Sequence, residues 1–367
     1  MAPFNYSRVD LARRRRGLTK AKLAEEVGVS PRMLRKYEHA ESEPSSLTIQ
    51  RMADVLGFPA PFFYGDTLDE PVREGVSFRS LSSLTERKGD QALASGALAL
   101  ALSDWIEARF ELPTPDVPQY EGTNPETAAA AVREAWGLGE RPVTNVVHLL
   151  EAHGVRVFSL DEGSNLDGFS FWRGEKPFVF LNVGKTVEHS RMDAAHELGH
   201  LVLHAHGGPG GREAEREAFA FGAAFLMPKG SIVAKVPQGA SLQTLIESKS
   251  YWRVSALALA RRVYGVGLIS EWQYRSICIA LSKYGKTNEP EPLRMPETSQ
   301  VLGKVVQALR AESVSQSSIA ADLCIPLDEL SKSVFGHMLR SMEGGAESSA
   351  AMEPTPEPEH RRQLRIV

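Results

Sequence analysis

One stretch constrains the fold more than any other: residues 191–204, which read R-M-D-A-A-H-E-L-G-H-L-V-L-H. Its alanines and leucines predict a largely apolar helix of the kind found in protein cores. His196 and His200 are four residues apart, so both imidazoles project from one face of that helix and can bind a Zn²⁺ ion. Glu197 lies beside them, where its carboxylate can take a proton from a zinc-bound water. In a chain with 10 histidines, coincidence produces this pattern in roughly one protein in a hundred.

A catalytic zinc ion needs a third protein ligand and an open position. Residues 212–227, R-E-A-E-R-E-A-F-A-F-G-A-A-F-L-M, predict a following helix that buries one apolar side. Glu215 falls on the face shared with Gly222, whereas Glu217 lines up with Phe221. Spacing therefore leaves both glutamates as candidates, with Glu213 as a weaker third. His204 shares a face with His200, and it is a group that supports a ligand, a hydrogen-bond donor to the transition state, or a core histidine.

Three short segments rich in β-branched and aromatic residues predict strands: 155–160, 168–172 and 177–182. R-G-E-K lies between the last two, a connection of hairpin length. A sheet of this kind can hold an extended peptide beside a metal by main-chain hydrogen bonds. It can equally be no more than the core of a small α+β domain, and the sequence favours neither reading.

The chain's 367 residues suffice for two or three domains with their own cores. No apolar run approaches the length of a membrane span, and the first ten residues contain no apolar signal region. Cys278 and Cys324 lack the spacing of a zinc site, so we expect reduced core residues in a cytoplasmic protein. The net charge is −4, yet residues 1–66 hold 11 Lys and Arg against 8 Asp and Glu. A basic N-terminal region followed by an acidic remainder is typical of a DNA-binding module joined to another domain.

Residues 6–65 predict five short helices, at about 6–16, 20–27, 31–38, 46–56 and 59–64. The second and third, separated by a turn that contains glycine, form a helix-turn-helix pattern, in which the second helix of the pair enters the major groove. That helix would present Arg32, Met33, Arg35 and Lys36 to the bases, with Lys20 and Arg14 available for phosphates. A small solvated helical bundle with scattered surface charge is the alternative.

The stretch G-L-T-K-A-K-L-A-E-E-V-G-V-S-P-R-M-L-R-K-Y-E, followed by E-P-S-S-L-T-I-Q-R-M-A-D-V-L-G, closely resembles the Cro-type helix-turn-helix repressors of the XRE family. The resemblance implies binding to double-stranded DNA through residues 6–65. Members commonly have Gln where this chain has Lys20, so that position suits phosphate or guanine and loses bidentate recognition of adenine.

A second resemblance covers about residues 150–290. G-F-S-F-W, P-F-V-F-L-N, R-M-D-A-A-H-E-L-G-H-L-V-L-H and E-R-E-A-F-A-F-G-A-A-F-L-M-P together resemble the ImmA/IrrE family of metallo-endopeptidases. In that family two histidines and a glutamate upstream of L-M-P hold the metal. The resemblance thus implies Zn²⁺ as cofactor, with His196, His200 and Glu215 as ligands and Glu197 as the catalytic residue. The family usually has Asn where this chain has Phe219.

The expected fold is mainly α with a small β-sheet, an α+β arrangement. It comprises a five-helix DNA-binding domain at 6–65, a linker and long helix at 66–120, and a metallopeptidase domain at 121–290. A helical C-terminal region at 291–343 and a disordered tail at 344–367 follow. We expect the long helix at about 85–110 and further helices at 125–137, 143–153, 254–285 and 299–335.

Taken together, these features predict a cytoplasmic transcriptional regulator that carries a zinc-dependent endopeptidase. By family resemblance its protein partner would be a repressor or antitoxin that it cleaves; no membrane is involved, and a homodimer is compatible with the sequence. The rival prediction is a transcription factor whose peptidase-like domain only senses a metal or ligand. An intact Glu197 favours the enzyme, because a sensor has no need of that carboxylate.

Overall fold

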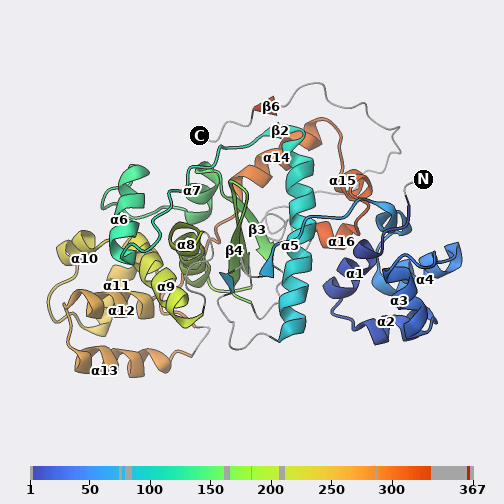
Figure 1. Cartoon of the computed structure of the whole chain (residues 1–367). Coiled ribbons are helices and arrows are strands. Elements are labelled where there is room, and N and C mark those ends of the chain that lie inside the picture. Colours follow the sequence, from blue (N-terminus) through green and yellow to red (C-terminus); the bar gives the residue numbers. More distant parts are fainter. Residues whose placement is uncertain are drawn as a thin grey trace. The chain divides into compact units, whose positions relative to one another are not determined.

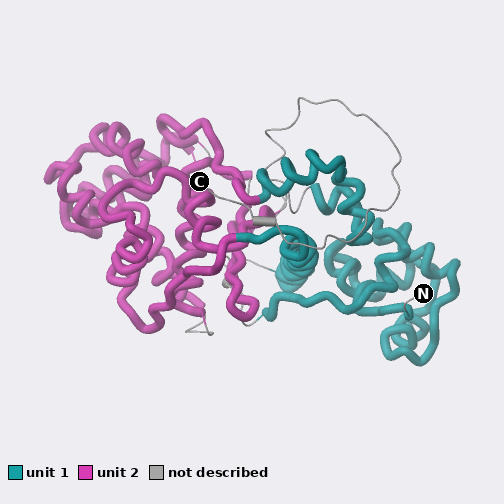
Figure 2. Tube along the Cα trace, turned by 90° about the horizontal axis from the view of Figure 1, so that it is seen from above, with its two compact units in different colours: residues 1–73, 82–112, 302–365 teal, residues 74–81, 113–301, 366–367 magenta. Residues whose placement is uncertain are grey.

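The structure of the chain, a computed structural model, describes residues 3–73, 77–78, 85–160, 166–182, 184–205, 211–285, 288–331 and 362–363. The chain divides into two compact units (Figure 2). Unit 1 comprises Met1–Arg73, Ser82–Leu112 and Leu302–Arg365, and unit 2 comprises Glu74–Leu81, Pro113–Val301 and Ile366–Val367. Helices dominate both units and the larger sheet has four strands (Figure 1), which confirms the expected fold class.

Five N-terminal helices of unit 1 form where the sequence predicts them. They are α1 (Tyr6–Arg15), α2 (Lys20–Val27), α3 (Pro31–Glu38), α4 (Ser46–Leu56) and the 3₁₀ helix η1 (Ala60–Tyr64). Local chemistry sets their limits: the Ser30 side chain accepts the Met33 N–H at the start of α3, and Gly28 ends α2 at a φ of 76°. Their buried residues, including Leu23, Leu34 and Phe62, form a small core.

The rest of unit 1 is a long helix followed, much later in the chain, by short ones. These elements are α5 (Glu86–Glu107), β2 (Phe110–Glu111), α14 (Gln300–Ala311) from Leu302 onward, α15 (Gln316–Asp322), α16 (Leu327–Glu329) and β6 (Arg362–Gln363). Of the tail expected to be disordered, 344–367, only β6 belongs to the described residues, and it pairs in parallel with β2. No helix in the described part of the chain combines the length and apolarity needed to cross a membrane.

The sheet of unit 2 contains the three strands that the sequence predicts and a fourth from the linker. They are β1 (Ser77–Phe78), β3 (Arg156–Leu160), β4 (Gly168–Arg173) and β5 (Lys176–Asn182), in the order β1-β4-β5-β3. β4 and β5 form the expected antiparallel hairpin, whereas β3 runs parallel to β5 and β1 runs antiparallel to β4. Phe169 and Phe171 of β4 stack on phenylalanines of β5 on one face of the sheet.

The helices of unit 2 pack around one extended hydrophobic core. They are α6 (Pro125–Ala135), α7 (Val146–Ala152), α8 (Val187–Leu203), α9 (Arg212–Leu226), α10 (Lys229–Lys235), α11 (Leu242–Trp252), α12 (Ala256–Val266) and α13 (Glu271–Ser282). Sequence periodicity did not indicate α10 and α11. Cys278 and Cys324 are both free, as expected, but each is half-buried and neither belongs to the core.

Helices α8 and α9 pack at unusually close range because each has a glycine at the contact. A Cβ atom on Gly222 of α9 would lie 3.0 Å from the backbone N of His196, and one on Gly199 of α8 would lie 2.9 Å from the carbonyl O of Ala218. Real Cβ atoms essentially never come nearer than this to other heavy atoms, so larger residues would push the helices apart. The two glycines therefore set the spacing of α8 and α9.

Two buried glutamates tie the starts of helices in unit 2 together. Glu297 accepts the N–H groups of Val146 and Val147 at the start of α7, and it also pairs with Arg191 of α8. Glu151 of α7 accepts the N–H groups of Gln300 and Val301 at the start of α14. A carboxylate at a helix N-terminus satisfies N–H groups that have no partner within the helix, and it complements the helix dipole.

Glu151 makes the stability of the fold depend on pH. Burial raises the pKa of this carboxyl group to about 7, although hydrogen bonds from Ser299, Val301 and Gln300 act in the opposite direction. Between the ordinary pKa of 4.5 and about 7 the folded chain holds a proton that the unfolded chain releases, so stability falls as the pH rises through this window.

We predict that Glu151→Gln, which stays neutral at every pH, removes this dependence. Chemical denaturation at several pH values should show the unfolding free energy of the unchanged protein falling relative to the variant by on the order of 2–3 kcal/mol between the two pKa values. Parallel pH profiles of the two proteins would mean that Glu151 ionises in the folded chain as it does in the unfolded one.

Candidate metal centre and recognition helix

Helix α8 places two imidazoles together inside unit 2. The Thr186 side chain caps its start by accepting the N–H of His189, and the helix then runs unbroken to Leu203 with nearly every residue buried. His196 and His200 lie one turn apart, with side chains 1% and 4% exposed. Their Nε2 atoms are 3.1 Å apart, so both rings direct the same nitrogen to one point.

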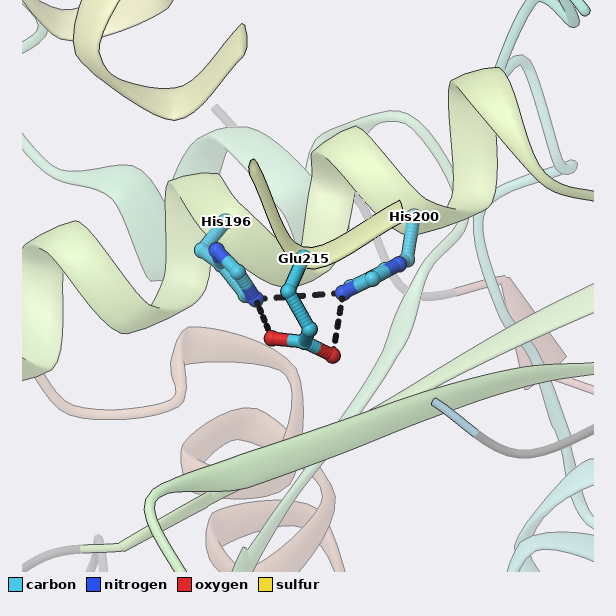
Figure 3. Close-up of side chains that lie close together, drawn as sticks. All are labelled: His196, His200 and Glu215. Atoms are coloured by element: carbon cyan, nitrogen blue, oxygen red, sulfur yellow. Dashed lines mark hydrogen bonds and ion pairs between the residues drawn. The ribbon is translucent and has the colours of Figure 1, made fainter. Parts of the chain in front are cut away.

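Glu215 of α9 completes this group (Figure 3). Its Oε2 lies 3.3 Å from Nε2 of His196 and its Oε1 lies 3.4 Å from Nε2 of His200. Glu215 is two helical turns before Gly222, on the same side of α9, so the close contact of the two helices brings its carboxylate to the histidine pair.

The donor set and its spacing fit a zinc ion. Two ligands at ~2.1 Å from a tetrahedral zinc lie about 3.4 Å from each other. The observed separations among the three residues are 3.1, 3.3 and 3.4 Å. Two imidazole nitrogens and a carboxylate are also the ligand types found in catalytic zinc sites.

Of the three glutamates that the sequence left as candidates, only Glu215 joins this group. Glu213 is exposed to solvent. Glu217 instead accepts a hydrogen bond at its Oε2 from Nε2 of His204, over 2.9 Å. His204 therefore forms hydrogen bonds beside the site and does not belong to the group of three.

Hydrogen bonds through His204 determine which nitrogen of His200 carries its proton. If Glu217 is ionised and His204 neutral, Nε2 of His204 donates to Glu217 and Nδ1 of His204 accepts. That Nδ1 lies 3.2 Å from Nδ1 of His200, which must then be the donor. In this tautomer, which applies when a metal is bound, Nε2 of His200 carries the lone pair that a metal ligand requires; without a metal the same nitrogen can instead donate to Glu215.

The charges of the group also suit a cation. Burial lowers the pKa of His200 to about 4, so its imidazole is neutral at pH 7. Burial alone would raise the pKa of Glu215, but hydrogen bonds with His196 and His200 outweigh it and bring that pKa to about 2. At neutral pH the site therefore presents an anionic carboxylate and a neutral His200, which is the protonation state that binds zinc.

Glu197 lies outside the group of three, as a residue that acts beside a metal and not on it would. It is fully buried, and Ser170 Oγ of β4 donates to its Oε2 over 2.7 Å. Gly168, on the same face of β4, leaves room for this carboxylate, since a Cβ there would lie 3.1 Å from Oε1 of Glu197. Sequence analysis missed Ser170; the signal was the alternation in G-F-S-F-W, which places Gly168, Ser170 and Trp172 on one face.

A second cluster near the start of α8 brings together Asp167, His189 and Asp193. The ammonium group of Lys185 contacts Asp167 and lies 3.6 Å from Oδ2 of Asp193 and 3.4 Å from Nε2 of His189. A lysine thus supplies the positive charge here, so this cluster is an ion-pair network that fixes the entry to α8.

Helix α3 presents the residues that the sequence assigns to base contacts. Arg32, Met33 and Arg35 are exposed and Lys36 is partly so, whereas Leu34 and Tyr37 on the opposite side are buried. Lys20, at the start of α2, is about half exposed and pairs with Glu38 of α3 over 2.5 Å. Lys20 therefore links the two helices of the motif, and a DNA phosphate would compete with Glu38 for it.

Three arginines at the end of α1, Arg14, Arg15 and Arg16, form ion pairs with acidic residues. Arg14, expected to be available for phosphates, binds Asp10 and Glu70. Arg15 and Arg16 both bind Glu329, a carboxylate of α16 that is only 3% exposed. Glu70 and Glu329, both outside residues 1–66, therefore neutralise part of the positive charge of that region.

Two regions of the chain match protein-family models. Residues 150–264, which contain His196, Glu197, His200 and Glu215, match the family model of the IrrE N-terminal-like domain. Residues 10–63 match the helix-turn-helix family model. No curated protein matched the chain. The chain thus joins a region that matches XRE-type helix-turn-helix proteins to a region that matches IrrE/ImmA-like peptidases.

Proposed function

We propose that this protein is a DNA-binding regulator whose unit 2 is a zinc-dependent endopeptidase that cleaves a repressor or antitoxin. The observation that carries the proposal is the convergence of His196, His200 and Glu215 at the mutual distances of zinc ligands. The substrate class comes from the likeness to the ImmA/IrrE family.

In this proposal the residues of α8 and α9 have separate roles in hydrolysis. His196, His200 and Glu215 hold the ion, which when bound supplies Lewis acidity at the scissile carbonyl and its attacking water. Glu197 takes a proton from that water and returns it to the leaving amine. Ser170 orients the Glu197 carboxylate through its hydrogen bond, and Glu217 with His204 keeps His200 in the tautomer that binds metal.

Helix α3 would read DNA in the major groove. Arg32, Met33, Arg35 and Lys36 lie on its solvent side, with Arg32 at its N-terminal end, from which helix-turn-helix proteins contact base edges. Lys20 would exchange its ion pair with Glu38 for a phosphate contact.

One observation favours the rival function, a metal or ligand sensor without proteolysis. The carboxylate of Glu197 is fully buried and held by Ser170, as a purely structural residue would be. The two functions differ in what they require of Glu197, because only the enzyme needs it as a base.

We predict that the purified protein contains about one zinc ion per chain and cleaves a repressor encoded beside it in the presence of zinc but not of a chelator. Glu215→Gln should lose most of the metal and all cleavage, because two ligands hold zinc poorly. Glu217→Gln is the matched control: its amide oxygen still accepts from His204, so metal affinity should fall no more than ~10–100-fold, the usual range for a group behind a ligand. Metal analysis showing the opposite order would transfer the ligand role to Glu217.

A second prediction concerns DNA. The full chain should bind a duplex from its own promoter with affinity that falls steeply as salt rises. Arg32→Ala should cost about 1–3 kcal/mol on that duplex and little on a scrambled one, because Arg32 would contact a base. Lys20→Ala should weaken binding to both duplexes alike.

Lys22→Ala serves as the control, since it removes one exposed positive charge of α2 that pairs with Glu25 and Glu26. It should leave the ratio between the two duplexes unchanged. Absence of salt-dependent binding to any duplex would refute the DNA-binding proposal.

A further inference from the structure

We propose that Ser77–Phe78 is an internal ligand of the peptidase: it occupies the edge of β4 where an extended substrate segment would bind. The identity of that substrate rests on the proposed function, but the binding of a peptide strand to β4 does not.

β1 pairs with a strand of unit 2 although the chain on either side of its segment belongs to unit 1. Ser77 pairs with Ser170 and Phe78 with Phe169, in the antiparallel sense. The segment Glu74–Leu81 belongs to unit 2, whereas the residues before and after it belong to unit 1. The chain thus leaves one unit, adds a short strand to the sheet of the other, and returns.

The strand that β1 joins is the one that lies along the candidate active site. Ser170, the pairing partner of Ser77, donates to the carboxylate of Glu197. One strand position further on that face, Trp172 Nε1 donates to the carbonyl O of Leu201, so β4 follows α8 beyond the metal-binding turn. Figure 3 shows a strand of this sheet crossing beside the three side chains, with a short blue segment of earlier sequence next to it.

The main-chain groups at the edge of a strand determine what that edge can bind. The side of β4 turned away from β5 presents alternating N–H and C=O groups, which an extended peptide satisfies by main-chain hydrogen bonds. Such binding tolerates many sequences, and β1 binds in the antiparallel sense. We therefore infer that the edge takes an extended, locally unfolded segment of a protein, and that β1 is its resident occupant.

β1 competes strongly with free peptides for the edge of β4, yet a longer segment can displace it. A segment tethered by a short linker has an effective concentration of about 1 mM, so a free peptide of equal intrinsic affinity must approach that level to replace it. Two paired residues give few hydrogen bonds, so a longer substrate segment that pairs along more of β4 would displace β1. The linker would thereby exclude chance peptides and admit a proper substrate.

The test uses the full chain with zinc and with Glu197→Gln throughout, so that no bound peptide is cut. Ser77→Pro with Phe78→Pro removes both N–H groups of β1, and Ser77→Ala with Phe78→Ala is the control that keeps them. The probe is a labelled synthetic peptide of residues 74–81, E-G-V-S-F-R-S-L.

In the proline variant, hydrogen exchange at those amides of Phe169–Phe171 that point toward β1 should speed up at least ~10-fold, and the peptide should bind at least ~10-fold more tightly than it binds the alanine variant or the unchanged linker. Bound peptide should slow that exchange again. Unchanged exchange in β3 shows that the fold is intact. Equal β4 exchange in both variants, or equal peptide binding by all three proteins, would overturn the proposal.

A further measurement needs no substitution in the linker. At saturating peptide, exchange of whichever Ser77 or Phe78 amide points toward β4 should accelerate, because the peptide displaces β1; no acceleration would again count against the proposal. Repeating the binding with Glu197 intact then asks whether the peptide is hydrolysed. A negative result there would challenge the proposed peptidase and leave the strand-binding result standing.

Discussion

The close contact between α8 and α9 is the constraint on which the candidate site depends. Gly199 and Gly222 allow the two backbones to approach until a Cβ on either would clash. At that spacing Glu215 reaches the Nε2 atoms of His196 and His200. Larger residues at the glycines would move the carboxylate away while leaving all three candidate ligands in the sequence, so the motif alone does not make the site.

Around this contact, several polar groups of the site are held by specific partners. Ser170 holds Glu197, and Glu217 acts on His200 through His204. Further back, Arg191 fixes the early part of α8 by pairing with Glu297 and binding the carbonyl O of Val143. A buried polar group is costly without such partners, so their presence indicates a site whose geometry is set before any ligand arrives.

Local sequence signals predicted much of this arrangement. Capping residues and glycines placed the N-terminal helices, alternation placed β4 and β5, and the His196/His200 spacing placed the histidine pair. Local sequence does not predict ion pairs between residues far apart in the chain. Nothing in the sequence around Arg14, Arg15 and Arg16 indicates that Glu70 and Glu329 bind them. The family resemblance implied Glu215, but residue spacing left Glu217 open, because spacing along one helix does not specify which face meets its neighbour.

The central claim is that Glu197 acts as a base, and one comparison tests it most directly. The Glu197→Gln protein and the unchanged protein, both loaded with zinc, are incubated with the repressor encoded beside the chain. Glutamine keeps the size and polarity of the side chain but cannot accept a proton, so zinc content and operator binding should be equal while cleavage falls at least ~100-fold. A Glu197→Gln protein that still cleaves the repressor at the original rate, or still regulates its target in cells, would contradict the account.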